Sequence, residues 1–180
     1  PKLSALHHPY TMGETAENLV DRYDISRVEQ DEFALESQQK ARAGTDARAD
    51  ELFPVEVPAG KGTVSVTSDE HPRPETTLDA LAKLKPLFRE GGTVTAGNSS
   101  GLTDGAAAMV LMSESRAKAE GRDPLARIIG MSWAGVPPEI MGIGPGPATK
   151  KALDRTGLSL ADIDLLEINE ACAAQVIACE

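Results

Sequence analysis

The composition of the chain changes within residues 91–113, GGTVTAGNSSGLTDGAAAMVLMS, and this change decides the fold. Glycines and small polar side chains fill the first half of this stretch, and an apolar run from Ala106 to Met112 fills the second. A short apolar run bounded by turn signals is typical of a buried strand. We therefore expect an irregular front section up to about residue 102 and layered α/β structure after it.

Beyond this run, apolar and amphipathic segments alternate along the chain. Residues 125–136 and 162–169 are apolar runs of the kind that form strands. Between the runs, helices are expected at 114–121, after a serine cap, and at 145–156, which starts on a proline and ends before a glycine. Strand, helix, strand, helix, strand in this order predicts a right-handed parallel α/β arrangement.

The front section carries two helix start signals. A first helix is expected with Glu14 or Thr15 as its cap. Ser26 and Glu29 then fit the spacing of a capping box, in which each side chain accepts a hydrogen bond from the other residue's backbone N–H, and Gly44 is a plausible end for the second helix. Charged and amide residues occupy much of this second helix, so one of its faces is expected to be exposed to solvent.

Short strands are expected next. Residues 51–74 alternate apolar and polar side chains twice, around Ala59-Gly60-Lys61-Gly62. Pro54 and Pro58 have no N–H to donate to a ladder, so these strands are expected at an edge. Thr77 is expected to cap a short amphipathic helix.

Composition excludes several classes of protein. The chain is 41% hydrophobic and 26% charged, as ordinary globular proteins are. Its net charge of −10 argues against nucleic-acid binding, and no run is long and apolar enough to be read as a membrane span. Only Cys172 and Cys179 are present, which makes a reducing compartment, the cytoplasm, the expected location. No metal site is expected, because the three histidines show no ligand spacing.

The end of the last apolar run is the first candidate site. Ligands bind outside the carboxyl ends of strands in open α/β sheets, and Asn169 and Glu170 stand at such an end. An Asn amide there can hold a water or a carbonyl oxygen on which negative charge develops. The alternative is that Asn169 only caps the following helix. Glu170 is explained equally well as a solvated partner of the helix dipole and as a buried orienting group. From this motif alone the cap is the favoured interpretation.

Residues 91–105, called the glycine-rich stretch below, and two sulfur side chains are weaker candidates. Gly97 and Gly101 would let a backbone approach a ligand, and polar residues between them offer contacts, although a tight turn explains the pattern as well. Met141, among flexible glycines, either lines a ligand tunnel or fills core. Cys172 is near a helix start, which can activate a thiol, but its alanine neighbours favour core packing.

Four segments in one order resemble the thiolases, the group of acetyl-CoA acetyltransferases and 3-ketoacyl-CoA thiolases. They are MGETAENL (12–19), SRVEQDEFALESQQKA (26–41), DEHPRPETTLDALAKLKPLF continuing into GTVTAGNSSGLTDGAAAMVLMSE (69–114), and MGIGPGPATKKAL with DIDLLEINEACAAQ (141–175). The resemblance covers nearly the whole chain, and TAGNSSGLTDGAAA and NEACAAQ are its specific motifs.

The resemblance implies a partial α/β fold of layered α-β-α-β-α type, with an irregular loop domain inserted. On this mapping residues 1–102 are most of the loop domain that binds substrate and coenzyme A. Residues 103–124 complete the N-terminal thiolase half, and residues 125–180 begin the C-terminal half. Homodimers or homotetramers are implied for the full-length protein.

The reaction implied is acyl transfer between an enzyme cysteine and coenzyme A, as thiolysis of a 3-ketoacyl-CoA or Claisen condensation of two acyl-CoAs. Coenzyme A is a substrate here, and no cofactor is implied. Asn169 matches the family's catalytic oxyanion-hole asparagine. The other matches are substrate-binding positions: the pantetheine-contacting serine is Ser100, the apolar positions beside that arm are Leu84, Phe88 and Ala96, and the acyl-pocket methionines are Met12 and Met141.

The chain also departs from the family pattern. The acylated cysteine is expected upstream of this stretch, and the Gly-His-Pro histidine and the second cysteine downstream, so we expect a fragment that is inactive by itself. Cys172 stands where the family usually has Phe. Two alternatives remain open: a non-catalytic acyl-CoA- or lipid-binding thiolase homologue, and an interaction domain whose glycine stretch merely turns.

Overall fold

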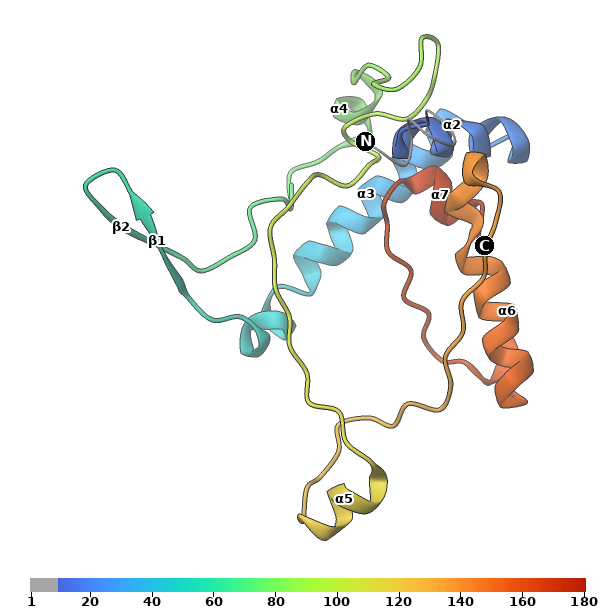
Figure 1. Cartoon of the computed structure of the whole chain (residues 1–180). Helices are drawn as coiled ribbons and strands as arrows, with labels where there is room; N and C mark the ends of the chain where they lie inside the picture. The colour runs from blue at the N-terminus through green and yellow to red at the C-terminus, as the bar shows by residue number, and fades with distance from the viewer. Residues whose placement is uncertain (1–9) are drawn as a thin grey trace.

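Three helices form the centre of the molecule. The computed structural model describes residues 10–180. Helices α2 (Met12–Tyr23) and α3 (Arg27–Ala43) both pack against the short helix α7 (Ala173–Ile177), so the last part of the chain lies against the first (Figure 1). The 3₁₀ helix η2 (Pro138–Ile143) covers α2.

Both long helices begin with a capping box. Thr11 caps α2, its hydroxyl accepting from the Glu14 N–H while the Glu14 carboxylate accepts from the Thr11 N–H. The expected cap at Glu14 or Thr15 is therefore wrong by three or four residues, because Glu14 takes the reciprocal third position of the box. Ser26 and Glu29 form the box predicted for α3, and the helix ends at Gly44 as expected.

The core between these helices is small. Its apolar members are Ala16, Val20, Val94, Cys172 and Ala174, with Phe88 packed against them. Polar side chains share this interior: Glu17 and Gln30 are each 0% exposed. Gln30 and its buried neighbour Asp31 lie on the helix expected to have a wet face, so burial there is more polar than the sequence indicates.

Glu17 ties the glycine-rich stretch to α2. Its carboxylate accepts hydrogen bonds from the N–H groups of Thr93 and Val94, both at 2.8 Å, and is paired with the Arg89 guanidinium at 3.4 Å. Arg89 also forms a two-pronged pair with Asp21, which lowers the pKa of the Asp21 carboxyl. A buried carboxylate needs such partners, because water no longer solvates it.

An antiparallel hairpin projects from the helices (Figure 1). It follows the 3₁₀ helix η1 (Asp46–Glu51) and pairs β1 (Val55–Ala59) with β2 (Gly62–Val66), every residue of both strands being exposed. Gly60 opens the two-residue turn at φ +59°, a backbone conformation that L side chains rarely adopt. The short strands predicted on the two sides of Gly60 are confirmed, and the structure pairs them as a hairpin.

The remaining helices follow their predicted signals. Thr77 caps α4 (Leu78–Ala82), and Ser113 caps α5 (Glu114–Ala119). Helix α6 (Pro145–Thr156) starts on its proline and ends at Gly157, whose left-handed φ is +72°. The last 3₁₀ turn, η3 (Leu160–Asp162), follows it. Within residues 10–180, no helix combines the length and apolar character needed to cross a bilayer.

The three predicted parallel strands are absent from the described part of the chain. Residues 106–112, 125–136 and 163–169 carry no strand ladder and are largely exposed, with Met109 at 80% and Leu165 at 76%. They run as long connections around α5 and α6 (Figure 1). A strand exists through hydrogen bonds to a neighbour, and these segments do not pair with one another. The apolar pattern indicated segments suited to a sheet, but these three segments do not pair with one another as strands.

Candidate functional site

The two candidate loops of the sequence lie side by side. The Ser100 N–H donates to the Ala171 carbonyl at 3.0 Å, and the Ala173 N–H donates to the Asn98 carbonyl at 2.9 Å. Ser99 and Cys172 form an isolated antiparallel bridge between the same segments. Residues 98–100 are thus bonded like a short strand to residues 171–173, although the two lie far apart in sequence.

A cavity of about 500 Å³ opens beside this junction. Residues of α3, of the loop before α4, of the glycine-rich stretch and of the segment before α7 line it: Phe33, Ala34, Ser37, Gln38, Ala41, His71, Pro72, Gly97, Asn98, Ser99, Ser100, Glu167, Ile168, Asn169, Glu170 and Ala173. The structure therefore brings Ser100 and Asn169 to one cavity. Its size falls within the range of small-molecule sites.

Asn169 does not cap the following helix. Helix α7 begins four residues later, at Ala173, after Cys172, and that start has no side-chain cap. Asn169 is exposed, and among residues 10–180 no hydrogen bond involves its side chain. Within this range only its backbone carbonyl is used, which accepts from the Ala171 N–H. The capping interpretation is wrong, and the amide is left available to a ligand or a bound water.

Glu170 is hydrogen-bonded to α3, which also lines the cavity. Its carboxylate accepts a hydrogen bond from the Ser37 hydroxyl of α3. The sequence did not predict Ser37 as the partner of Glu170, because the contact joins segments that are distant in sequence. With Glu170 held by Ser37, the neighbouring Asn169 is anchored to α3 through the chain.

The apolar candidates lie at two places: Leu84 and Ala96 beside Gly97, and Phe88 against α2 and the core. A Leu84 methyl carbon lies 2.5 Å from where a Cβ of Gly97 would be, so the glycine makes room for Leu84. Ala96, beside it, is exposed. The Phe88 ring lies 2.2 Å from where a Cβ of Gly13 would be, and it packs on the core. These three residues do not line the cavity itself.

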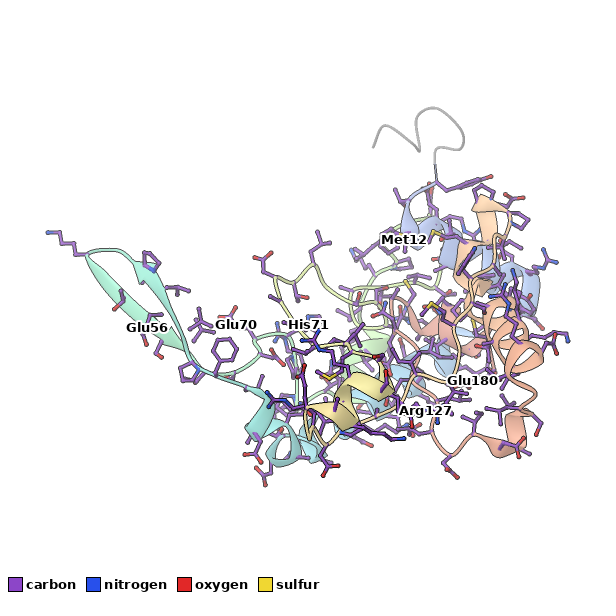
Figure 2. All side chains as sticks on the ribbon, turned by 60° about the horizontal axis from the view of Figure 1, so that its bottom comes forward. Met12, Glu56, Glu70, His71, Arg127 and Glu180 are labelled. Carbon is purple, nitrogen blue, oxygen red and sulfur yellow. The ribbon has the colours of Figure 1, made fainter. Side chains whose placement is uncertain are left out.

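The two methionines lie away from this cavity. Met12 is 55% exposed on α2 and Met141 is 43% exposed in η2, the two elements that pack together. Neither lines the cavity, and Figure 2 shows Met12 well separated from His71, which does. Within the described residues, the site therefore has two groups of candidates: Ser100 and Asn169 at the cavity, and the methionines on α2 and η2.

Sequence reasoning missed part of the cavity wall. Phe33 and Ser37 come from α3, whose polar face was expected to meet solvent, and His71 comes from a loop given no role. The His71 ring lies 3.0 Å from where a Cβ of Gly101 would be, so it packs directly on the glycine-rich stretch. No local pattern marks these residues, because contacts between distant segments assemble the wall.

Metal ligation finds no support in the described residues. Between residues 10 and 180 no three His, Cys, Asp or Glu side chains are grouped as a metal would require. His7 and His8 lie outside the described residues. The polar groups at the cavity are amides, hydroxyls, an imidazole and carboxylates, which suit hydrogen bonding to a thioester or amide ligand.

Cys172 is a core residue. It is 6% exposed, belongs to the apolar core and does not line the cavity. Burial raises the pKa of its thiol, and it also raises that of the half-buried Cys179. The core-packing interpretation is confirmed, since a nucleophilic cysteine needs a lowered pKa and access to substrate.

A thiol-labelling experiment checks this placement. In the folded protein, iodoacetamide at pH 8 should modify Cys172 at least about tenfold more slowly than in the urea-unfolded protein, because only exposed thiolate reacts. Mass spectrometry of the peptide that contains Cys172 gives both rates. Equal rates would contradict burial of this thiol.

Comparison with known proteins gives a consistent match along the chain. The family model described as "Thiolase, N-terminal domain" matches residues 1–115, and the model described as "Thiolase, C-terminal domain" matches residues 122–180. The acetyl-CoA acetyltransferase of Rhizobium meliloti is 53% identical over 178 residues, which are 98% of this chain and 45% of that protein. The beta-ketothiolase BktB of Cupriavidus necator is 51% identical over 182 residues, 98% of this chain and 46% of that protein.

A solved structure agrees with the sequence matches. The Bacillus anthracis acetyl-CoA acetyltransferase superposes with a TM-score of 0.92 at 53% identity, covering 97% of this chain and 44% of that one. The expected partial α/β fold is confirmed by this match, even though the exposed apolar segments form no ladder among themselves. The chain spans less than half the length of these relatives.

Proposed function

The chain belongs to the thiolase family, and from this premise we propose that the full-length protein transfers acyl groups between a cysteine of its own and coenzyme A. The observation that carries the proposal is the meeting of Ser100 and the unbonded Asn169 amide at one cavity. The nucleophilic cysteine and its base are proposed to lie outside residues 1–180. Neither cysteine of this stretch lines the cavity.

The proposed step begins at the 3-keto carbon of a 3-ketoacyl-CoA. A cysteine thiolate forms a C–S bond to that carbon, and the bond between carbons 2 and 3 breaks. The electron pair goes to carbon 2, giving the enolate of acetyl-CoA, which takes a proton and leaves. The thiol of a second coenzyme A then accepts the acyl group from the enzyme sulfur. Condensation of two acyl-CoAs is the reverse sequence.

Asn169 is proposed to stabilise the enolate. Negative charge collects on the thioester oxygen during carbon–carbon bond cleavage, and an amide donor acts on it directly or through a held water. Its side chain has no other hydrogen-bond partner in residues 10–180, so no bond must break before it serves the ligand. An interaction that strengthens with this charge lowers the barrier rather than merely tightening substrate binding.

The substrate is proposed to pass along the glycine-rich stretch. Ser100 would hydrogen-bond the pantetheine arm, with Leu84, Phe88 and Ala96 as its apolar neighbours. Met12 and Met141 do not line the cavity of Ser100 and Asn169, and the acyl pocket that they are proposed to line would lie beside α2 and η2. Their flexible side chains suit a short acyl chain. No cofactor beyond the substrate coenzyme A is proposed. A homodimer or homotetramer is proposed for the full-length protein.

One assay tests the proposed function. The full-length protein is mixed with acetoacetyl-CoA and coenzyme A, and loss of the acetoacetyl-CoA absorbance is followed against a blank without coenzyme A. Coenzyme A-dependent cleavage is expected. Binding of acetoacetyl-CoA without cleavage would instead identify a non-catalytic acyl-CoA-binding homologue. If acetoacetyl-CoA is neither bound nor cleaved, the result would favour an interaction domain.

A further inference from the structure

Asn98 occupies the junction between the two candidate loops. It is 3% exposed, and all polar atoms of its side chain are hydrogen-bonded. Its Oδ1 accepts from the Thr95 N–H at 2.8 Å, and its Nδ2 donates to the Thr93 carbonyl at 3.1 Å. These two bonds close residues 93–98 of the glycine-rich stretch into one fixed shape, with Ser100 just beyond them.

The same residue bonds outward in two directions. Its side-chain Nδ2 donates to Oδ1 of Asp31 on α3 at 3.0 Å. Its backbone carbonyl accepts from the Ala173 N–H at 2.9 Å. The first bond fixes the glycine-rich stretch to a helix. The second fixes the segment that carries Asn169 to the glycine-rich stretch.

Asp31 passes the connection on to a third element. Its Oδ2 accepts from the Arg27 Nε at 2.8 Å, and it is 4% exposed. The Arg27 guanidinium in turn donates to the carbonyls of Leu81 and Leu84, at 2.6 and 3.1 Å, at the end of α4. We call Arg27, Asp31 and Asn98 the α3 network. It fixes the backbone at Leu84 and beside Ser100 and Asn169 to one helix.

We propose that Asn98 is a positioning residue, which sets the distance between the oxyanion donor Asn169 and the coenzyme A-contacting Ser100. The inference rests on the proposed function for its effect on the reaction. Asn98 is buried with its side chain saturated, so it has no donor left for substrate. It acts through the two loops that it joins.

The expected effect follows from the geometry of catalysis. A misplacement of about 1 Å between reacting groups can cost about 100-fold in rate. Loss of the Asn98 side-chain bonds would release the glycine-rich stretch from its fixed shape and from α3. The backbone bond from the Ala173 N–H to the Asn98 carbonyl remains, and it would pass the displacement to the segment that carries Asn169. We therefore expect kcat to fall because Asn169 is displaced, and KM to rise because Ser100 is displaced. Removal of the Ser100 hydroxyl alone should raise KM and leave kcat nearly unchanged.

Substitution of Asn98 in the full-length enzyme tests the proposal. Asn98→Asp keeps the acceptor for the Thr95 N–H but sets a carboxylate against the carboxylate of Asp31. We expect kcat/KM per folded molecule to fall about 10- to 100-fold, with kcat and KM both changed. If this variant fails to fold, Asn98→Ser removes the Asp31 contact without added charge and carries the same expectation.

A reciprocal exchange supplies the rescue. In Asn98→Asp/Asp31→Asn, the amide on α3 can donate to the carboxylate at position 98, so the link between the elements is restored with the donor and acceptor reversed. The amide oxygen at position 31 can still accept from Arg27, whereas the bond to the Thr93 carbonyl stays lost, so the recovery is partial. About a tenfold recovery of kcat/KM over the single variant is expected. Ser26→Ala is the matched control, because it removes a cap bond from the same helix and should leave kcat/KM per folded molecule unchanged.

Amide hydrogen exchange makes the test independent of turnover. In Asn98→Asp, or in Asn98→Ser if that is the folded variant, exchange at Ser100 and Ala173 should rise at least about tenfold, while exchange at Gly157, after α6, should not change. If the wild-type protein is inactive, the proposed function fails and this exchange still decides the role of Asn98. Unchanged exchange, a wild-type kcat/KM in the single variant, or a double variant as impaired as the single one would overturn the inference.

Discussion

The purified 180-residue chain, tested alone, is expected to show no coenzyme A-dependent cleavage of acetoacetyl-CoA. Covalent acyl transfer needs an activated thiol that reaches the substrate. Cys172 is buried in the core, Cys179 is half-buried, and the pKa of each thiol is raised by burial. Neither lies at the cavity that holds Asn169. An oxyanion donor without a nucleophile leaves no covalent path.

The measurement compares this chain with the full-length protein at equal molar concentration, each against a blank without enzyme. Circular dichroism of the chain, run in parallel, reports its helix content. Turnover by the chain above the blank would contradict the prediction and would place the nucleophile within residues 1–180. The double variant Cys172→Ser/Cys179→Ser would then tell whether either thiol is responsible.

Asn169→Ala in the full-length enzyme is expected to lower kcat by about 10- to 1000-fold. This range is the scale of a lost oxyanion donor, with smaller values when the amide acts through water. KM should change little, because the interaction strengthens in the transition state. Stability should change by less than about 0.5 kcal/mol, since the side chain is exposed and caps no helix. Steady-state kinetics and urea unfolding of the same preparations give these values.

Asn169→Asp sharpens this test by placing negative charge where negative charge must develop. Its kcat should fall at least as far as that of Asn169→Ala, with the fold intact. Gln39→Ala is the matched control, because it truncates another exposed amide that does not line the cavity. A folded Asn169→Asp enzyme with near-normal kcat would remove Asn169 from the catalytic proposal.

Local features of this fold could be predicted because neighbours in sequence determine them. The Ser26–Glu29 box, the caps at Thr77 and Ser113, and the turn at Gly60 each depend on residues within one turn of the chain. The cap of α2 was missed, although Thr11 and Glu14 have the same spacing as Ser26 and Glu29. The family also followed from sequence, since its motifs are contiguous stretches. The division at residues 102 and 124 remains a prediction.

The candidate site could be predicted residue by residue, but its assembly could not. Sequence placed Asn169 at the end of an apolar run. The structure showed that within residues 10–180 its amide has no hydrogen-bond partner and that Ser100 lies at the same cavity. The methionines of the same resemblance lie elsewhere, near α2 and η2. The contact between Ser37 and Glu170 joins residues 133 positions apart, and no periodicity marks such a pair.

By itself the sequence determined the family, the helix caps at Ser26, Thr77 and Ser113, the short strands around Gly60 and the segments suited to further strands. Tertiary structure alone decided which polar residues are buried, as with Glu17 and Asp31, and which apolar runs lack a ladder. The physical reason is the range of the interactions. Caps and turns are satisfied by adjacent backbone groups, whereas a buried carboxylate or a strand is stabilised only by partners that folding brings from distant parts of a chain.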